Sequence, residues 1–210
     1  MNEPSCFAEI VGMLSDVAVG MAAVVAAYVA WRGLKTWKEQ LSGTSEYELA
    51  RRVLRALYTH RNAINGVRHP FMSVEEMPEP EDAGEMSREQ VRHHGIAKAY
   101  QARWDRVMAA RRELDAELLE AEVLWGAELG SRFKAIDALE RELFVAVGTH
   151  VQQNEPALHA RRREALGRRA ATRRDVLFGN FDDGPDPYLS EYVAAVRAIE
   201  DYLRPHLRRK

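Results

Sequence analysis

The sequence predicts an all-α protein with one N-terminal transmembrane helix followed by a cytoplasmic helical bundle that contains a long helical hairpin. Two observations carry this prediction. Residues 10–31 form a run of 22 mostly apolar side chains with a single charge. In the rest of the 210-residue chain, apolar residues recur three and four positions apart, which is the spacing of one helix face. Glycine and proline fall between these faces and separate the helices.

The apolar run at residues 10–31 is long enough to cross a bilayer. A helix of this length measures about 33 Å, and the hydrocarbon core of a membrane is roughly 30 Å thick. Its only charge is Asp16, which is costly to place in lipid. The alternative is a buried helix of a soluble bundle, since the run is rich in alanine. Aromatic residues that favour the headgroup layer stand at its C-terminal side: Tyr28, Trp31 and Trp37.

Charges on either side of the run predict its orientation. Residues 1–9 carry two glutamates and no base. Three bases follow the run within residues 32–43, namely Arg32, Lys35 and Lys38. Positive flanks stay in the cytoplasm, so we expect a short external tail at residues 1–9 and a cytoplasmic helical domain at residues 44–210. The expected location is the inner (cytoplasmic) membrane, crossed once.

Small residues line two neighbouring sides of the same run. They recur every four residues and therefore form rows along the helix. One row is Gly12, Asp16 and Gly20, and the other is Ala18, Ala22, Ala26 and Ala30. Small side chains let helix backbones approach closely in a membrane, and an acid there tends to face a partner. The expected partners are therefore the lipid bilayer and further copies of the same chain.

The segment after the run is expected to break and restart. Residues 32–43 extend the first helix as far as Ser42–Gly43. Ser45 and Glu48 match a capping box, which predicts the start of a second helix. The apolar face of that helix ends near Asn65–Gly66, and proline at position 70 excludes further helix.

The middle of the chain predicts a loop and a hairpin. Residues 73–86 hold six acids, three helix breakers and no base, which predicts a mobile acidic loop. Ser87 caps a long helix that reaches Trp125, and Gly126 and Gly130 mark a bend before a further helix that ends at Asn154. The apolar face of this further helix is Phe133, Ile136, Leu143 and Val147. The face of the first of these helices resembles a coiled-coil seam, with Tyr100, Trp104, Val107, Arg111, Leu114, Leu118, Ala121 and Trp125. We expect the two helices to pack antiparallel.

The C-terminal part begins with a basic segment at residues 161–174. Its arginines are Arg161, Arg162, Arg163, Arg168, Arg169, Arg173 and Arg174. Residues 176–178 are then expected to be extended and residues 179–187 to form a turn. A final helix should carry one apolar face from Tyr188 to Leu207 and end or fray at Pro205.

Several short motifs of this chain resemble those of an uncharacterised family of bacterial single-span membrane proteins. The first motifs are Trp31-Arg32-Gly33-Leu34, Thr36-Trp37, Leu41, Gly43 and Glu48-Leu49-Ala50-Arg51-Arg52. The match continues at Tyr58, Arg61, Ala63-Ile64, Arg68 and Pro70-Phe71, and returns at Ala195-Val196, Ile199-Glu200 and Leu203-Arg204-Pro205-His206-Leu207. It covers both ends, about half of the chain. The resemblance implies a membrane-tethered cytoplasmic protein and implies no activity, substrate or catalytic residue.

Candidate catalytic residues come from the spacing of arginine and histidine. Helical ribonucleases of the HEPN type use an Arg followed by four to six residues and a His, which act as acid, base and phosphate clamp. Arg55 with His60 fits this spacing, and so does Arg88 with either His93 or His94. An arginine-rich chain produces about this many matches by chance. Arg55 and His60 are the better pair because they lie on a well-predicted helix.

Metal and cofactor sites are not predicted. Glu89 and His93 share a helix face beside His94, but too few further ligands converge there. With a single cysteine, the chain has no cysteine-based zinc site. Arg61 and Arg68 either close a polar pocket or, more commonly for such residues, pair with nearby carboxylates.

The basic segment offers three partners. It could contact anionic lipid, nucleic acid, or an acidic surface, which is either the 75–85 loop of this chain or another protein; a solvated helix face is the alternative to all three. Aromatic residues for base stacking are absent from residues 157–175, which argues against nucleic acid. The predicted function is thus a non-enzymatic, oligomeric adaptor or signalling component at the membrane. The alternatives are a membrane-perturbing effector in bacterial defence, in which Asp16 lines a wet path, and a HEPN-like ribonuclease.

Overall fold

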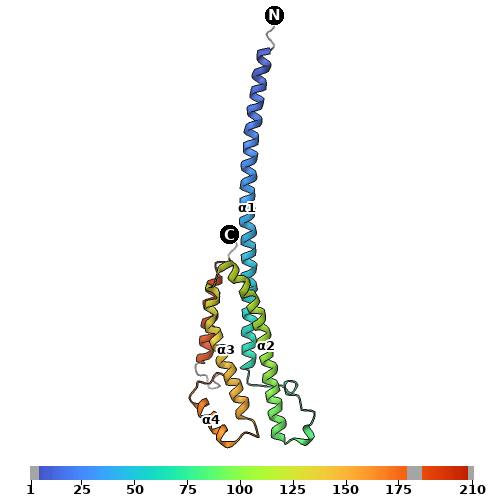
Figure 1. Ribbon diagram of the computed structural model, residues 1–210, viewed down its shortest axis with the longest axis vertical. Coiled ribbons are helices and arrows are strands. Elements are labelled where there is room, and N and C mark those ends of the chain that lie inside the picture. The colour runs from blue at the N-terminus through green and yellow to red at the C-terminus, as the bar shows by residue number, and fades with distance from the viewer. Residues whose placement is uncertain (1–4, 179–185, 208–210) are drawn as a thin grey trace. The chain divides into compact units, whose positions relative to one another are not determined.

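A computed structural model describes the backbone of residues 5–178 and 186–207, and the side chains there except those of residues 5–12, 14–18, 38–43 and 169–170. Within these ranges every regular element is a helix, so the all-α prediction is confirmed (Figure 1). The chain divides into two compact units, residues 1–47 with 208–210, and residues 48–207. The described part of the first unit is one stretch of helix, whereas the second unit holds the bundle.

The first helix is longer than predicted. α1 (Ser5–Val67) is uninterrupted, so the break expected at Ser42–Gly43 is wrong. Glycine weakens a helix by about 1 kcal/mol relative to alanine, but it keeps its backbone donor and does not clash as proline does. The capping box at Ser45 and Glu48 is also wrong, because both residues lie inside α1. The end of α1 agrees with the predicted end at Asn65–Gly66.

The bundle contains the predicted antiparallel hairpin. α2 (Arg88–Trp125) packs against α3 (Glu128–Gln153), and Gly126 joins them with a φ of 74°. That backbone conformation favours glycine, which explains the sharp turn at Gly126. The bend predicted at Gly130 is wrong, because that residue lies inside α3. α4 (Ala160–Ala171) and α5 (Pro187–Leu203) both pack on α3. α3 is therefore the element that the other bundle helices share.

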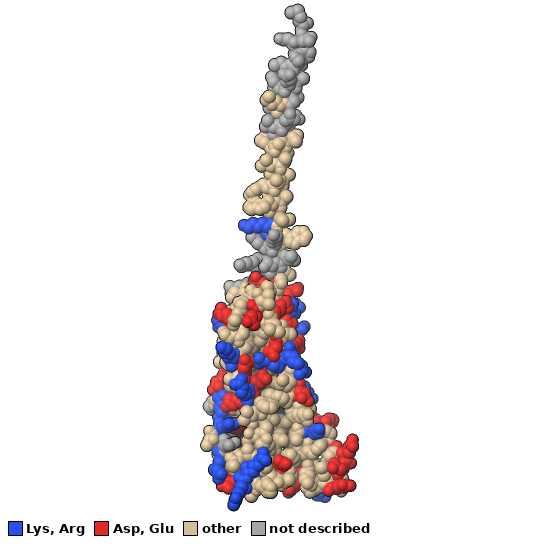
Figure 2. All heavy atoms as spheres, viewed as in Figure 1, with Lys and Arg blue, Asp and Glu red and all other residues tan. Residues whose placement is uncertain are grey.

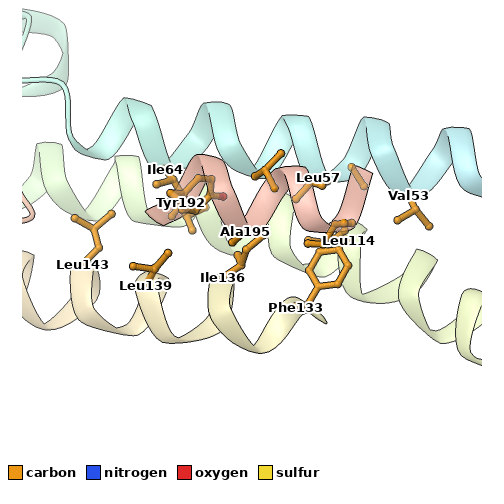
Figure 3. Packing of buried hydrophobic residues seen from close by; sticks show 14 of the residues in the cluster. Val53, Leu57, Ile64, Leu114, Phe133, Ile136, Leu139, Leu143, Tyr192 and Ala195 are labelled. Carbon is orange, nitrogen blue, oxygen red and sulfur yellow. The ribbon is translucent and has the colours of Figure 1, made fainter. Parts of the chain in front are cut away.

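The core lies where residues 49–67 of α1 meet α2, α3 and α5, and side chains from all four helices point toward one another there (Figure 3). The fully buried members include Leu57, Ile64, Leu114, Phe133, Ile136, Leu143, Tyr192 and Ile199. The predicted apolar faces of α3 and α5 are thus the faces that pack. Burial of each such side chain contributes about 1.5–3 kcal/mol, which holds the bundle together.

The connecting segments differ in part from the prediction. The 73–86 segment carries two 3₁₀ turns, η1 (Val74–Glu76) and η2 (Ala83–Glu85). Ser87 caps α2 as predicted, since its side chain accepts a hydrogen bond from the backbone of Gln90. Residues 176–178 form no strand. The turn predicted over residues 179–187 falls mostly on 179–185, which lie outside the described residues.

Candidate functional site

The most unusual surface of the described chain is the apolar part of α1 at residues 19–37. Its large apolar side chains are between 55% and 70% exposed. They are Val19, Met21, Val24, Val25, Tyr28, Val29, Trp31, Leu34 and Trp37. In a helix with 3.6 residues per turn these positions fall on every side, so no single apolar stripe faces a core. Helices α2, α3 and α5 differ from this segment, because each buries one apolar face.

The small residues of this segment are open as well. Ala22, Ala26 and Ala30 are exposed, and a side chain added at Gly20 would meet no atom within 4 Å. One predicted row thus leaves its backbone accessible along the described part of the helix. The side chains of Gly12, Asp16 and Ala18 lie outside the described residues, so their predicted roles stay predictions.

The C-terminal end of the segment combines aromatic rings with basic side chains. The rings of Tyr28 and Trp31 lie 6.3 Å apart between centroids. Arg32 follows directly, and the hydroxyl of Thr36 donates a hydrogen bond of 3.0 Å to the Arg32 carbonyl. Lys35 lies on the same exposed stretch, and the side chain of Lys38 lies outside the described residues.

Among the described residues, no helix holds a stretch that is both long and apolar enough to cross a membrane. This finding covers only part of the predicted run at residues 10–31, in which the described side chains are those of Met13 and of residues 19–31.

The structure separates the predicted catalytic pair on α1. His60 is completely buried, whereas the side chain of Arg55 is 72% exposed and lies 3.6 Å from Glu113. Positions five apart point to different sides of a helix, so the two side chains diverge. No described contact brings them together, and a buried histidine offers no access to a phosphodiester.

His60 is instead the centre of a buried polar network. Its Nε2 lies 2.9 Å from a carboxylate oxygen of Glu140 on α3, and its Nδ1 lies 3.0 Å from the hydroxyl of Tyr192 on α5. Glu140 also lies 3.4 Å from Arg111 on α2. Burial by itself would raise the pKa of Glu140, but the hydrogen bond from His60 and the charge of Arg111 lower it. The network therefore joins four helices through satisfied polar groups, which is a structural role.

Two further arginines act in the same way. Arg103 is buried on α2 and donates to the carboxylate of Glu76 at 2.7 Å and to the carbonyls of His69 and Phe71 at 2.6 Å. Arg68 donates to Asp186 at 2.7 Å and to the Val176 carbonyl at 2.8 Å. Each holds an irregular segment against the bundle. Arg68 thus pairs with a carboxylate, while Arg61 stacks over the ring of Tyr58.

The other arginine and histidine candidates do not converge on a site. His93 Nε2 lies 3.0 Å from the Val151 carbonyl across the hairpin, while Arg88 and Glu89 are exposed. Among the described residues no group of three ligand side chains could hold a metal ion. The absence of a metal site remains a prediction for the whole chain.

The arginines of the basic segment differ in their surroundings. Arg161, Arg162, Arg163 and Arg168 are exposed on α4, and Arg168 pairs with Glu164. Arg174 instead binds two carboxylates of the bundle, Glu142 at 2.7 Å and Glu191 at 2.6 Å. The side chain of Arg169 lies outside the described residues.

Among the described residues, no ion pair or hydrogen bond joins the acidic loop to these arginines. Its Glu76 binds Arg103, and the loop and α4 occupy opposite corners of one end of the bundle (Figures 1 and 2). The predicted contact between the 75–85 loop and the basic segment therefore has no support among the described residues. Anionic lipid or an acidic protein surface stays a prediction for α4.

No protein-family model, curated protein or solved structure matches this chain. The resemblance to single-span bacterial proteins therefore stays a prediction.

Proposed function

We propose that this chain is a single-span membrane protein whose helical domain acts in the cytoplasm by assembly or by binding a partner. The observation that carries the proposal is the exposure of large apolar side chains on every side of α1 at residues 19–37. A helix that is apolar all round is stable only where something apolar surrounds it, either a protein core or lipid. The described residues place no such core around these side chains.

Lipid accounts for this helix better than a protein core does. The apolar run continues in the sequence to residue 10, so its full length of about 33 Å matches a bilayer of roughly 30 Å. Aromatic rings and basic side chains follow one another at its C-terminal end, as they do where a helix leaves the membrane on the cytoplasmic side. The short segment of residues 1–9 then lies outside.

Assembly is proposed because the exposed small residues permit close approach of two such helices. Ala22, Ala26 and Ala30 form one row, and in lipid a small-residue face allows contact between backbones. In the described part of the bundle, the buried side chains of His60, Arg68 and Arg103 are hydrogen-bonded to carboxylates, carbonyls or a hydroxyl. An oligomeric adaptor or signalling component fits this combination. The ribonuclease alternative lacks an accessible histidine at position 60.

Membrane extraction tests the anchor. The full chain should stay with the membrane pellet after washing at high salt and at alkaline pH, and dissolve only in detergent. Replacing Val24 and Val25 by Glu should release most of it, because a charge at the bilayer centre costs about 2.5–3.5 kcal/mol per residue. Leu119→Glu is the control, since Leu119 is 67% exposed on α2. A wild-type chain that leaves the membrane in salt alone would contradict the proposal.

A further inference from the structure

The bundle has a groove along α3 that the proposed function does not use. It measures about 890 Å³ and lies between α3, α4 and the irregular segment at residues 173–178. Ligand pockets in proteins typically enclose about 300–1,000 Å³, so the groove is large enough for a small molecule. Its lining along α3 extends from Ala138 to Gln153.

One wall of the groove is apolar. Val145 and Ala146 line it from α3, Leu166 from α4, and Leu177 and Phe178 from the irregular segment. Phe178 is anchored by an edge contact with the ring of His150, 5.5 Å away between centroids. His150 makes a second edge contact with Tyr100 at 5.7 Å. The ring of Phe178 is thus held in place by aromatic packing.

Unpaired positive charge lies at one end of the groove. The ion pair between Glu142 and Arg174 joins α3 to the irregular segment at that point. Arg141 and Arg173 are the sequence neighbours of these two residues, both line the groove, and neither has an ion pair among the described residues. The carboxylates nearby are already engaged, since Asp175 accepts hydrogen bonds from the backbone of Leu177 and Phe178.

The length of the groove matches an acyl chain that has its charged group at the Arg141 end. From Arg141 to Gln153 the groove follows α3 for about 18 Å, at 1.5 Å per residue. An acyl chain in one leaflet spans about 15 Å, half of the hydrocarbon core of a bilayer. A single acyl chain therefore fits along the apolar wall with its head group beside Arg141 and Arg173.

We propose that this groove binds a long-chain carboxylate, with its carboxylate at Arg141 and Arg173 and its chain along Val145, Ala146 and Phe178. Guanidinium groups form strong, charge-assisted hydrogen bonds with carboxylates. The apolar side chains of the lining accept the chain by removing apolar surface from water. The groove lies in residues 138–178, so this binding does not depend on how the N-terminal helix is anchored.

Photo-crosslinking to the full chain in neutral phospholipid nanodiscs tests the proposal. The probe is a long-chain carboxylate with a diazirine on its chain, and its matched control is the alcohol of the same length. The carboxylate should label peptides from residues 138–178 in a saturable manner, and unlabelled oleate should compete. Equal labelling by the alcohol would overturn the charge assignment. Labelling confined to residues 10–37 would overturn the site.

Substitutions locate the binding determinants. Replacing both Arg141 and Arg173 by Gln should lower labelling of the groove about tenfold or more, because each charge-assisted hydrogen bond is lost. The Arg161→Gln and Arg162→Gln double variant removes the same charge from α4 outside the groove and should label as the wild type does. Equal loss in both double variants would show non-specific attraction and would overturn the proposal.

A second pair of variants distinguishes loss of binding from loss of folding. Val145→Glu places a negative charge in the groove without removing a buried side chain, because Val145 is 39% exposed. Leu189→Glu on α5 is its matched control, with 40% exposure and no place in the groove. Val145→Glu should abolish saturable labelling while its thermal unfolding matches that of Leu189→Glu. Unchanged labelling in Val145→Glu would contradict the assigned position of the chain.

Discussion

Replacing His60 by Leu should destabilise the bundle. His60 is completely buried and lies within hydrogen-bond distance of Tyr192 and Glu140. Leu fills similar space but leaves the buried Tyr192 hydroxyl without a partner, which costs about 1–3 kcal/mol. Glu140 loses its hydrogen bond to position 60 but keeps Arg111 at 3.4 Å. Because water partly replaces the lost hydrogen bond, this loss costs about 1 kcal/mol. The expected total is about 2–4 kcal/mol.

A double-mutant cycle separates this network from simple packing. Tyr192→Phe in the His60→Leu background removes the orphaned hydroxyl and should recover about 1–2 kcal/mol, so the two changes are not additive. Thermal unfolding of the full chain in mild detergent, followed by far-UV circular dichroism, should show a decrease of about 5–15 °C for His60→Leu alone. A decrease below about 1 °C, or strict additivity in the cycle, would refute the assigned network.

The remaining predictions address separate parts of the molecule. Arg103→Gln should increase hydrogen exchange of residues 69–77 about tenfold or more, because Arg103 holds that segment against α2. Arg106→Gln should leave the exchange unchanged, since Arg106 is 68% exposed and lies 3.8 Å from Glu76. Equal effects of the two variants would contradict this role of Arg103. Gly126→Ala should cost about 1 kcal/mol because of its φ of 74°, whereas Gly130→Ala inside α3 should stabilise by up to about 1 kcal/mol in urea unfolding; a stabilising Gly126→Ala would be inconsistent with the turn. Burial lowers the pKa of His150 from 6.5, against an opposing effect of Asp175. The neutral ring is therefore favoured in the folded state, and the free energy of unfolding should decrease as the pH falls below about 6.5. His150→Gln should reduce this decrease, and a variant with the same pH profile of stability as the wild type would contradict the prediction. Gly20→Ile and Ala22→Ile should lower crosslinking between copies in mild detergent, whereas Val25→Leu should not, because only the first two place bulk on small-residue rows; equal crosslinking in all three would locate assembly elsewhere.

The helical faces were predictable because they depend on local periodicity. The apolar residues of α3 and α5 recur at helical spacing, and Phe133, Ile136, Tyr192 and Ile199 are all buried as that spacing requires. Caps and turns with a strong local signal were predictable too. Ser87 caps α2, and Gly126 has the positive φ of a turn.

The misplaced break in α1 has the opposite cause. Ser42–Gly43 is a weak local signal, and the favourable helix on both sides outweighs a cost of about 1 kcal/mol. The apparent capping box at Ser45 and Glu48 then has no helix start to cap. Short motifs of polar residues within a helix can therefore imitate a boundary.

The partners of the buried polar residues could not be predicted from local patterns. His60 contacts Tyr192, 132 positions away, and Glu140, 80 positions away. Spacing along the chain paired His60 with Arg55 instead, although the fold directs the two side chains apart. Arg103 offered one usable signal, since it stands between Tyr100 and Val107 on the core-facing side of α2. An arginine at a buried position needs a carboxylate or carbonyl partner.

Labelling of Cys6 in intact spheroplasts tests the proposed membrane span most directly. Cys6 is the only cysteine of the chain and precedes the apolar run, so the natural sequence already carries the probe site. If residues 10–31 cross the membrane with the bundle in the cytoplasm, a membrane-impermeant maleimide should label Cys6 without lysis. A Cys6→Ser, Lys98→Cys variant should be labelled only after lysis. Labelling of Cys6 that requires lysis, as for position 98, would contradict the span.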